Sequence, residues 1–171
     1  MHSIFLTSGR YACVVGLKNL GLKTGDKILM PDYICSTLVK KIKEYKFGIK
    51  FYNLKFNFKT DWKSVNDNFD SKIKAIMMVN YFGQPQEISK FIQFSKKKKI
   101  YLVEDNSHGY QNRYKGKILG TFGDIGFSSP YKKIPNLISG GILYSKKPID
   151  KNLNKSQYKP TLFEHFKTLI K

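Results

Sequence analysis

Short apolar runs that alternate with amphipathic segments constrain the fold of this sequence more than any other feature. The stretch Lys74–Asn80 is almost continuously apolar, and Ile100–Glu104 is a second run of this kind. Such runs are typical of parallel strands that are covered on both faces. Apolar residues recur at helical spacing in Arg10–Leu20, Ser36–Tyr45 and Glu87–Lys97. Strands that alternate with helices predict an α/β fold, a three-layer α/β/α sandwich with a mainly parallel sheet.

The rest of the chain fits the same plan. Strands are expected at Asp26–Met30 and Ile49–Leu54, and shorter ones near residues 117–119, 125–127 and 141–144. The polar stretch after Leu54 predicts a loop with a short helix. No internal repeat is visible, and a single domain is the default at 171 residues.

The charge is strongly positive, with 31 Lys and Arg against 12 Asp and Glu and a formal net charge of +19. Such a balance suggests an anionic partner. Only Arg10 and Arg113 are arginines, however, and arginine is the residue that usually reads bases and grips phosphate. We therefore favour a solvated, lysine-rich surface over a specific nucleic-acid site. Salt-sensitive binding to polyanions stays as an alternative.

Two cysteines, Cys13 and Cys35, are too few for a disulfide scaffold, which favours a reduced, cytoplasmic setting. No apolar run approaches the roughly 20 residues that cross a bilayer, so no membrane span is expected. The first residues lack the basic region and the long apolar region of a signal peptide. No metal site is predicted.

Functional groups of a parallel α/β sheet collect at the carboxyl ends of its strands, and three segments place unusual residues there. Asp105 follows a buried strand, where it either caps a turn or faces a cationic group of a ligand. Lys132 and Lys133 follow a stretch of small residues, and they are either candidate amine nucleophiles or part of an ordinary surface loop. Ser8 and Gly9 open a helix, where they either bind phosphate or form a common N-cap.

Together the three segments match the needs of one cofactor, pyridoxal 5′-phosphate. Its phosphate needs an anion site, its ring nitrogen needs a carboxylate that keeps it protonated, and its aldehyde needs a lysine. The turn at residues 8–9, Asp105 and the lysine pair at residues 132–133 supply these groups in that order along the chain.

Ordered sequence blocks carry a resemblance to a known family. They are residues 7–10 (TSGR), 21–31 (GLKTGDKILMP), 79–85 (VNYFGQP), 104–108 (EDNSH), 114–117 (YKGK), 123–128 (GDIGFS) and 140–141 (GG). In this order and spacing the chain resembles the large domain of the DegT/StrS family of sugar aminotransferases, which are fold-type I pyridoxal-phosphate enzymes.

The resemblance implies a role for each candidate residue. Asp105 would pair with the pyridine nitrogen, and His108 would lie beside the ring oxygen of the cofactor. Ser8, Gly9 and Arg10 would lie at the phosphate.

Ser128 or Ser129 would add a hydroxyl to the phosphate site. The Schiff-base lysine would be Lys132 or Lys133. The family pattern Ser-x-x-Lys-x-x-Pro fits Ser129, Lys132 and the proline three residues later, so we favour Lys132. Cys35 occupies the position at which the family often stacks an aromatic ring on the cofactor, and a sulfur contact would partly replace that ring.

The resemblance also implies an activity. It is the transfer of an amino group from an amino acid, commonly glutamate, to a keto group of a nucleotide-linked sugar, in surface polysaccharide or related sugar biosynthesis. Two alternatives stay open: a truncated, catalytically incomplete module, and a pyridoxal-phosphate-dependent sugar dehydratase. Some dehydratases of the family carry histidine at the lysine position, so the lysine here favours transamination.

Family members are much longer than this chain, which is therefore expected to be truncated. Residues 1–148 would form a cofactor-binding large domain with a short N-terminus. Residues 149–171, with a helical pattern from Thr161, would be a linker and the start of a missing C-terminal small domain. The family site forms between two subunits, so a homodimer is expected of the intact protein.

Overall fold

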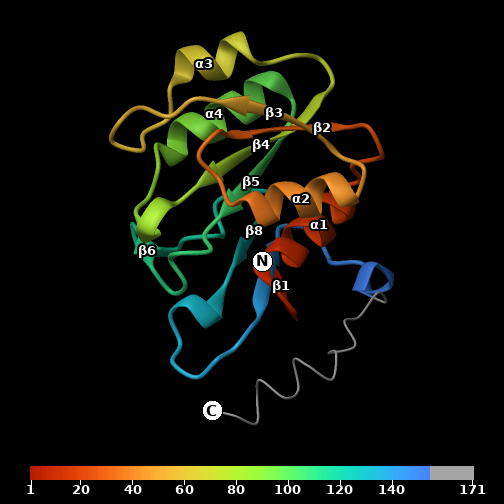
Figure 1. The fold of residues 1–171 in the computed structure, drawn as a ribbon, viewed down its shortest axis with the longest axis vertical. Helices are drawn as coiled ribbons and strands as arrows, with labels where there is room; N and C mark the ends of the chain where they lie inside the picture. The colour runs from red at the N-terminus through yellow and green to blue at the C-terminus, as the bar shows by residue number, and fades with distance from the viewer. Residues whose placement is uncertain (155–171) are drawn as a thin grey trace.

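The computed structural model describes residues 1–154. They form a seven-stranded sheet with helices on both faces (Figure 1). The helical pattern expected from Thr161 lies outside the described residues. The strands of the sheet are β1 (His2–Leu6), β2 (Lys27–Pro31), β3 (Gly48–Tyr52), β4 (Ile73–Val79), β5 (Tyr101–Asp105), β8 (Ile125–Ser128) and β9 (Gly141–Ser145).

The strand order is β1-β9-β8-β5-β4-β2-β3. The pairs β2–β3, β2–β4, β4–β5 and β5–β8 are parallel, whereas β9 pairs antiparallel with both β1 and β8. The predicted α/β fold with a mainly parallel sheet is therefore confirmed.

Two strands differ from the sequence-based expectation. No strand was expected at residues 2–6. β1 is an edge strand with mostly exposed residues, and its three apolar residues are consecutive, so they show no alternation of apolar and polar positions. The strand expected near residues 117–119 lies outside the main sheet, in a separate hairpin of β6 (Arg113–Tyr114) and β7 (Lys117–Ile118).

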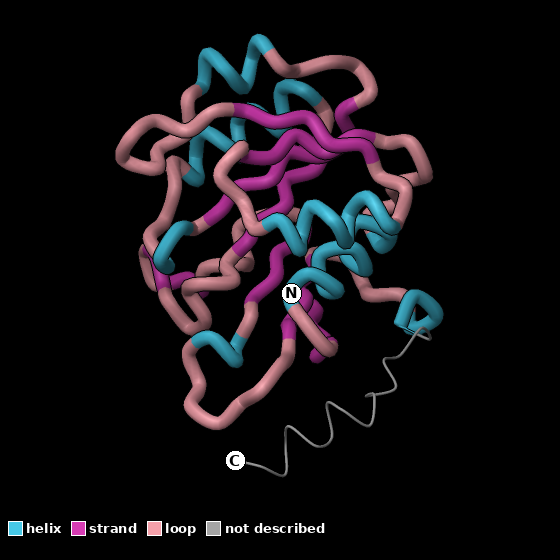
Figure 2. Tube along the Cα trace, in the orientation of Figure 1, coloured by secondary structure: helices cyan, strands magenta, loops and turns pink. Residues whose placement is uncertain are grey.

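The helices lie in two layers (Figure 2). Those that pack on one face of the sheet are α1 (Gly9–Asn19) and α2 (Ser36–Glu44), and those on the other are α3 (Trp62–Asp67) and α4 (Ile88–Lys98).

Strand β4 shows why its sequence is continuously apolar. Successive side chains of a strand point to opposite faces of the sheet. Ala75 and Met77 belong to the apolar cluster under α1 and α2, whereas Ile76 and Met78 belong to the cluster under α4. Both faces are buried at residues 75–79, so these positions favour apolar residues, whereas Lys74 near the start of the strand is exposed.

Helix α1 packs unusually close to the sheet. A Cβ atom on Gly16 would lie 2.6 Å from Ile125 Cδ1 and 2.8 Å from Leu143 Cδ1, so glycine permits this approach to β8 and β9. Gly21, with a left-handed φ of +89°, follows the end of the helix, as is common after helix C-termini. The close packing brings the start of α1 beside the carboxyl ends of the central strands.

Candidate active site

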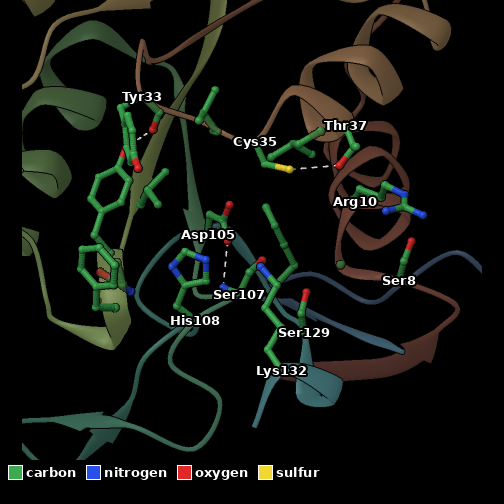
Figure 3. A pocket seen from close by; sticks show the side chains of 18 of the residues that line it. Ser8, Arg10, Tyr33, Cys35, Thr37, Asp105, Ser107, His108, Ser129 and Lys132 are labelled. Carbon is green, nitrogen blue, oxygen red and sulfur yellow. Dashed lines mark hydrogen bonds between the residues drawn. The ribbon is translucent and has the colours of Figure 1, made fainter. Parts of the chain in front are cut away.

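A pocket of about 450 Å³ opens at the carboxyl ends of the parallel strands (Figure 3). Its wall comprises the start of α1, the loop after β2, the ends of β4 and β5, and the segment after β8. The candidate residues that line it are Ser8, Gly9, Arg10, Cys35, Asp105, His108, Ser129 and Lys132. The structure thus gathers in one cavity residues that are spread over more than a hundred positions of sequence.

The start of α1 forms a small cradle at one end of the pocket. Ser8 caps the helix and accepts a hydrogen bond from the backbone N–H of Tyr11 at 3.3 Å. A Cβ atom on Gly9 would collide with Ser129 Oγ and would lie 3.4 Å from Ser107 Oγ. Glycine therefore leaves room between two hydroxyl groups at the positive end of a helix dipole, which is an arrangement that suits an anion.

Of the two candidate serines, only Ser129 is among the pocket-lining residues. Ser128 is the last residue of β8 and is 1% exposed. Since Phe127 and Ser129 line the pocket, strand alternation turns Ser128 towards the other face of the sheet.

The two acidic residues at the end of β5, Glu104 and Asp105, also point to opposite faces of the sheet. Glu104 is completely buried and accepts hydrogen bonds from the Asn80 side chain at 2.8 Å and from the backbone N–H of Phe122 at 2.7 Å. Asp105 lines the pocket and accepts a hydrogen bond from the backbone N–H of Ser107 at 2.8 Å. Only Asp105 is placed to meet a ligand.

The carboxylate of Asp105 carries a poorly compensated charge. The residue is 7% exposed, and burial raises the pKa of its carboxyl. The hydrogen bond from Ser107 and the positive charge of Lys132 oppose this shift. Within residues 1–154, no side-chain ion pair within 4.0 Å includes Asp105. A cation in the pocket would therefore stabilise this carboxylate.

The lysine pair follows β8 on a 3₁₀ turn, Pro130–Lys132. Lys132 lines the pocket, and its charge acts on three other groups there: it opposes the rise in the pKa of Asp105, and it adds to the lowering of the pKa of His108 and of the Cys35 thiol. Lys132 and Lys133 are both exposed, but Lys133 is not among the lining residues. The geometry therefore favours Lys132 as the amine that faces a ligand.

His108 is half-buried, close enough to Asp105 to feel its charge and stacked on the ring of Phe82. Burial is the main cause that lowers its pKa, and the charge of Lys132 adds to it, so the neutral imidazole is favoured. Its ring stacks with that of Phe82 at a centroid distance of 6.1 Å and an interplanar angle of 23°. His108 Nδ1 is buried without a hydrogen-bond partner in the described structure.

Cys35 lies at the start of α2 on the opposite side of the pocket. Its Sγ atom is 3.0 Å from Thr37 Oγ1, and this hydrogen bond lowers the pKa of the thiol. The second cysteine, Cys13, is completely buried on α1, and its pKa is raised by burial and by the charge of Asp105.

The pocket also contains residues that sequence reasoning did not single out. Ser107 supplies a hydroxyl beside Gly9, and Asn80 lies at the end of β4. Tyr33 and Phe82 form an aromatic side wall that is 61% and 63% exposed. Asn80, Phe82 and Ser107 lie within the sequence blocks at 79–85 and 104–108 that carry the family resemblance. Their position in these blocks was the one sequence signal that could have marked them as site residues.

The sequence matches the model of one protein family, described as the DegT/DnrJ/EryC1/StrS aminotransferase family, over residues 1–156. The chain belongs to this family. The earlier resemblance to it is confirmed, and the fold of the DegT/DnrJ/EryC1/StrS chain agrees with those of related solved structures. In the described part of the chain, no helix is long and apolar enough to span a bilayer.

Similar proteins are named for nucleotide-sugar chemistry. GDP-perosamine synthase of Escherichia coli O157:H7 is 31% identical over 127 residues, which are 72% of this chain and 34% of that protein. GDP-4-keto-6-deoxy-D-mannose 3-dehydratase of Escherichia coli O55:H7 is 31% identical over 150 residues, 83% of this chain and 39% of that protein. The chain thus spans well under half the length of these relatives.

A solved structure shows the same fold. It is that of the E. coli GDP-4-keto-6-deoxy-D-mannose-3-dehydratase with bound hydrated PLP. Its TM-score is 0.76 at 25% sequence identity, and the match covers 90% of this chain and 41% of that one.

Proposed function

We propose that residues 1–148 are the cofactor-binding domain of a pyridoxal-phosphate-dependent aminotransferase. The enzyme would transfer an amino group from an amino acid such as glutamate to a keto group of a nucleotide-linked sugar, for surface polysaccharide or related sugar biosynthesis. One observation carries this proposal: Asp105, Lys132 and the cradle at Gly9 line a single pocket in a chain of an aminotransferase family. The name of the perosamine synthase supports a nucleotide-linked sugar as acceptor.

The residues present fit this cofactor. The cradle at Gly9, with the hydroxyl groups of Ser107 and Ser129 and the helix N-terminus, suits a phosphate group. The buried carboxylate of Asp105 suits a protonated ring nitrogen, because an opposite charge offsets the burial that raises its pKa. His108, with a buried and unpartnered Nδ1, suits a polar ring substituent.

When bound, pyridoxal phosphate supplies an electron sink for the electron pair released at the reacting carbon of the substrate. The chain's own residues would do the remaining work. Lys132 would hold the cofactor through Nζ until the amino donor replaces it, and its free amine would then move the proton between the substrate carbon and the C4′ carbon of the cofactor. Asp105 would hold the proton on the ring nitrogen by charge pairing.

A sugar dehydratase is the second candidate function. The dehydratase relative is as similar to this chain, at 31% identity, as the perosamine synthase. A lysine in the pocket at position 132 supports transamination. Product analysis separates the two: with an amino donor and a nucleotide-linked keto sugar, an aminotransferase yields an amino sugar and a dehydratase yields a deoxy sugar.

A homodimer and a cytoplasmic location belong to the same proposal. The exposed aromatic wall of Tyr33 and Phe82 at the pocket mouth supports a second subunit that covers it. Light scattering coupled to size exclusion would measure the mass in solution, and a monomer at all concentrations would contradict the dimer.

The decisive experiment is a titration of the purified chain with pyridoxal phosphate, followed by its visible absorption. We expect a saturable band of lysine-bound cofactor in the parent protein and in Lys133→Ala, and no such band in Lys132→Ala. Borohydride reduction and peptide mapping would identify the modified lysine. Absence of the band from the parent would refute the proposal for this chain, and loss of the band only in Lys133→Ala would transfer the role to Lys133.

A further inference from the structure

Glu104 is a completely buried carboxylate that does not face the pocket. Its oxygen atoms accept hydrogen bonds from Asn80 Nδ2 at 2.8 Å and from the backbone N–H groups of Phe122 and Gly123 at 2.7 and 3.3 Å. Burial raises the pKa of this carboxyl, and the hydrogen bonds from these neutral donors oppose the shift. A buried carboxylate of this kind is costly to the fold, so its presence calls for a reason.

The partners of Glu104 belong to the two strands that flank β5. Asn80 directly follows β4, and Phe122 and Gly123 form the turn that leads into β8. This turn lies tightly against β5, because a Cβ atom on Gly123 would be 2.7 Å from the Leu102 carbonyl oxygen. One side chain therefore ties the ends of three adjacent strands together.

The same ties lead to the residues of the pocket. The backbone N–H of Asn80 donates to the carbonyl oxygen of Asp105 at 2.9 Å, so Asn80 bridges Glu104 and Asp105. On the other side, the turn at residues 122–123 sets the start of β8, which continues directly into Ser129 and Lys132. A shift of β8 would change the separation of the Asp105 carboxylate and the Lys132 amine, and a shift of β4 would release the backbone hydrogen bond that holds Asp105.

We propose that Glu104 is a positioning residue of the active site, which holds β4 and β8 against β5 so that Asp105 and Lys132 face the same ligand. This inference rests on the proposed cofactor. Glu104 would act because its side chain is long enough to hydrogen-bond to both flanking segments, and its negative charge would not be required. Groups that hold a reacting constellation must fix it within a fraction of an ångström, since small displacements weaken binding strongly.

Two variants separate reach from charge. Glu104→Gln keeps the length of the side chain and removes the charge; its oxygen can still accept from Phe122, and the Asn80 amide can turn to pair with the new NH₂ group. Glu104→Asp keeps the charge but shortens the side chain by one methylene, so it cannot reach both flanking strands. A matched control is Tyr52→Phe, which removes another buried hydrogen bond, from Tyr52 Oη to the Met77 carbonyl oxygen at 2.8 Å, outside the pocket lining.

The experiment measures the dissociation constant of pyridoxal phosphate and the free energy of unfolding of each cofactor-free protein. We expect Glu104→Asp to bind about tenfold more weakly or worse, the loss of roughly one charge-assisted hydrogen bond, while Glu104→Gln and Tyr52→Phe stay within about threefold of the parent. The pH midpoint of the visible absorption of bound cofactor should move in Glu104→Asp and not in Tyr52→Phe.

Each other outcome overturns the inference in a recognisable way. Weak binding by Glu104→Gln with normal binding by Glu104→Asp would show that the charge matters. Equal effects of Glu104→Asp and Tyr52→Phe on affinity would show a role in stability alone. If the parent protein does not bind the cofactor, the proposed function fails first, and the positioning role fails with it.

Discussion

The cradle at the start of α1 leads to a sharp prediction for Gly9→Ala. The added Cβ would collide with Ser129 Oγ and lie 3.4 Å from Ser107 Oγ and 3.5 Å from the Ser128 carbonyl oxygen, so it would fill the space assigned to the phosphate. Gly9 has an ordinary φ and the nearest clash is with a side-chain hydroxyl that can rotate. We therefore expect the fold to lose about 1 kcal/mol or less.

The expected loss of cofactor affinity is much larger. If the methyl group displaces the phosphate from two charge-assisted hydrogen bonds of about 1.5 kcal/mol each, binding weakens by about 3 kcal/mol, or roughly a hundredfold. Equilibrium titration, followed by absorption, measures this loss, and chemical denaturation of the cofactor-free protein measures the cost to the fold.

Pyridoxal without phosphate provides the control ligand. Gly9→Ala should weaken pyridoxal phosphate binding and leave pyridoxal binding nearly unchanged, because only the phosphate enters the cradle. An equal loss for both ligands, or no loss for either, would refute the assignment of this helix start as the phosphate site. The Ser129→Ala background adds a second check: there the effect of Gly9→Ala should shrink, because the clash and one hydroxyl are both already gone.

Three further predictions follow from burial. Because burial raises the pKa of Asp105, the folded chain holds that proton more tightly than the unfolded chain. This contribution to the free energy of unfolding is complete below the ordinary aspartate range and is lost as pH rises through the raised pKa. The free energy of unfolding of cofactor-free Asp105→Asn, measured by denaturant titration, should therefore increase relative to that of the parent as pH rises from about 4 to neutrality. A difference between the two proteins that does not change across that range would contradict the reasoning. An alkylating reagent should modify exposed Cys35 quickly and buried Cys13 only on unfolding, with pyridoxal phosphate protecting Cys35, as measured by mass spectrometry. Gly16→Ala should destabilise the fold by about 1–3 kcal/mol through its clash with Ile125, whereas a gain in stability would show that helix propensity outweighs packing.

Much of the fold was predictable because its signals are local. The two buried faces of β4 impose a continuous apolar run, and the amphipathic periods of α2 and α4 mark helices that cover a sheet. The exposed edge strand β1 carried no such signal, since its pairing depends on β9, which lies more than a hundred residues away. A strand near residues 117–119 was expected, but its pairing in a separate hairpin of β6 and β7 was not, because a two-residue strand has no period that shows its partner.

The candidate site was only partly predictable. The order of a helix start, an acidic residue and a lysine along the chain indicated a cofactor, since each residue type has distinct chemistry. The family pattern favoured Lys132 over Lys133, but the sequence could not choose between Ser128 and Ser129, because they are adjacent and of the same residue type. The pocket lining favours Ser129 and Lys132, and the roles of these residues stay a proposal.

The sequence by itself determined the class of fold and the chemistry on offer, because apolar periodicity and residue type are properties of short segments. The sequence already pointed to Asp105 as the acid at the site, but only the tertiary structure showed that Asp105 lines the pocket and that the adjacent Glu104 ties three strands together. Adjacent residues of a strand point to opposite faces of the sheet, so Asp105 and Glu104 have different surroundings. The hydrogen-bond partners of Glu104 lie next to β4 and β8, two strands that are far apart along the chain. Contacts between distant segments set which side chain meets a ligand, and no local pattern encodes them.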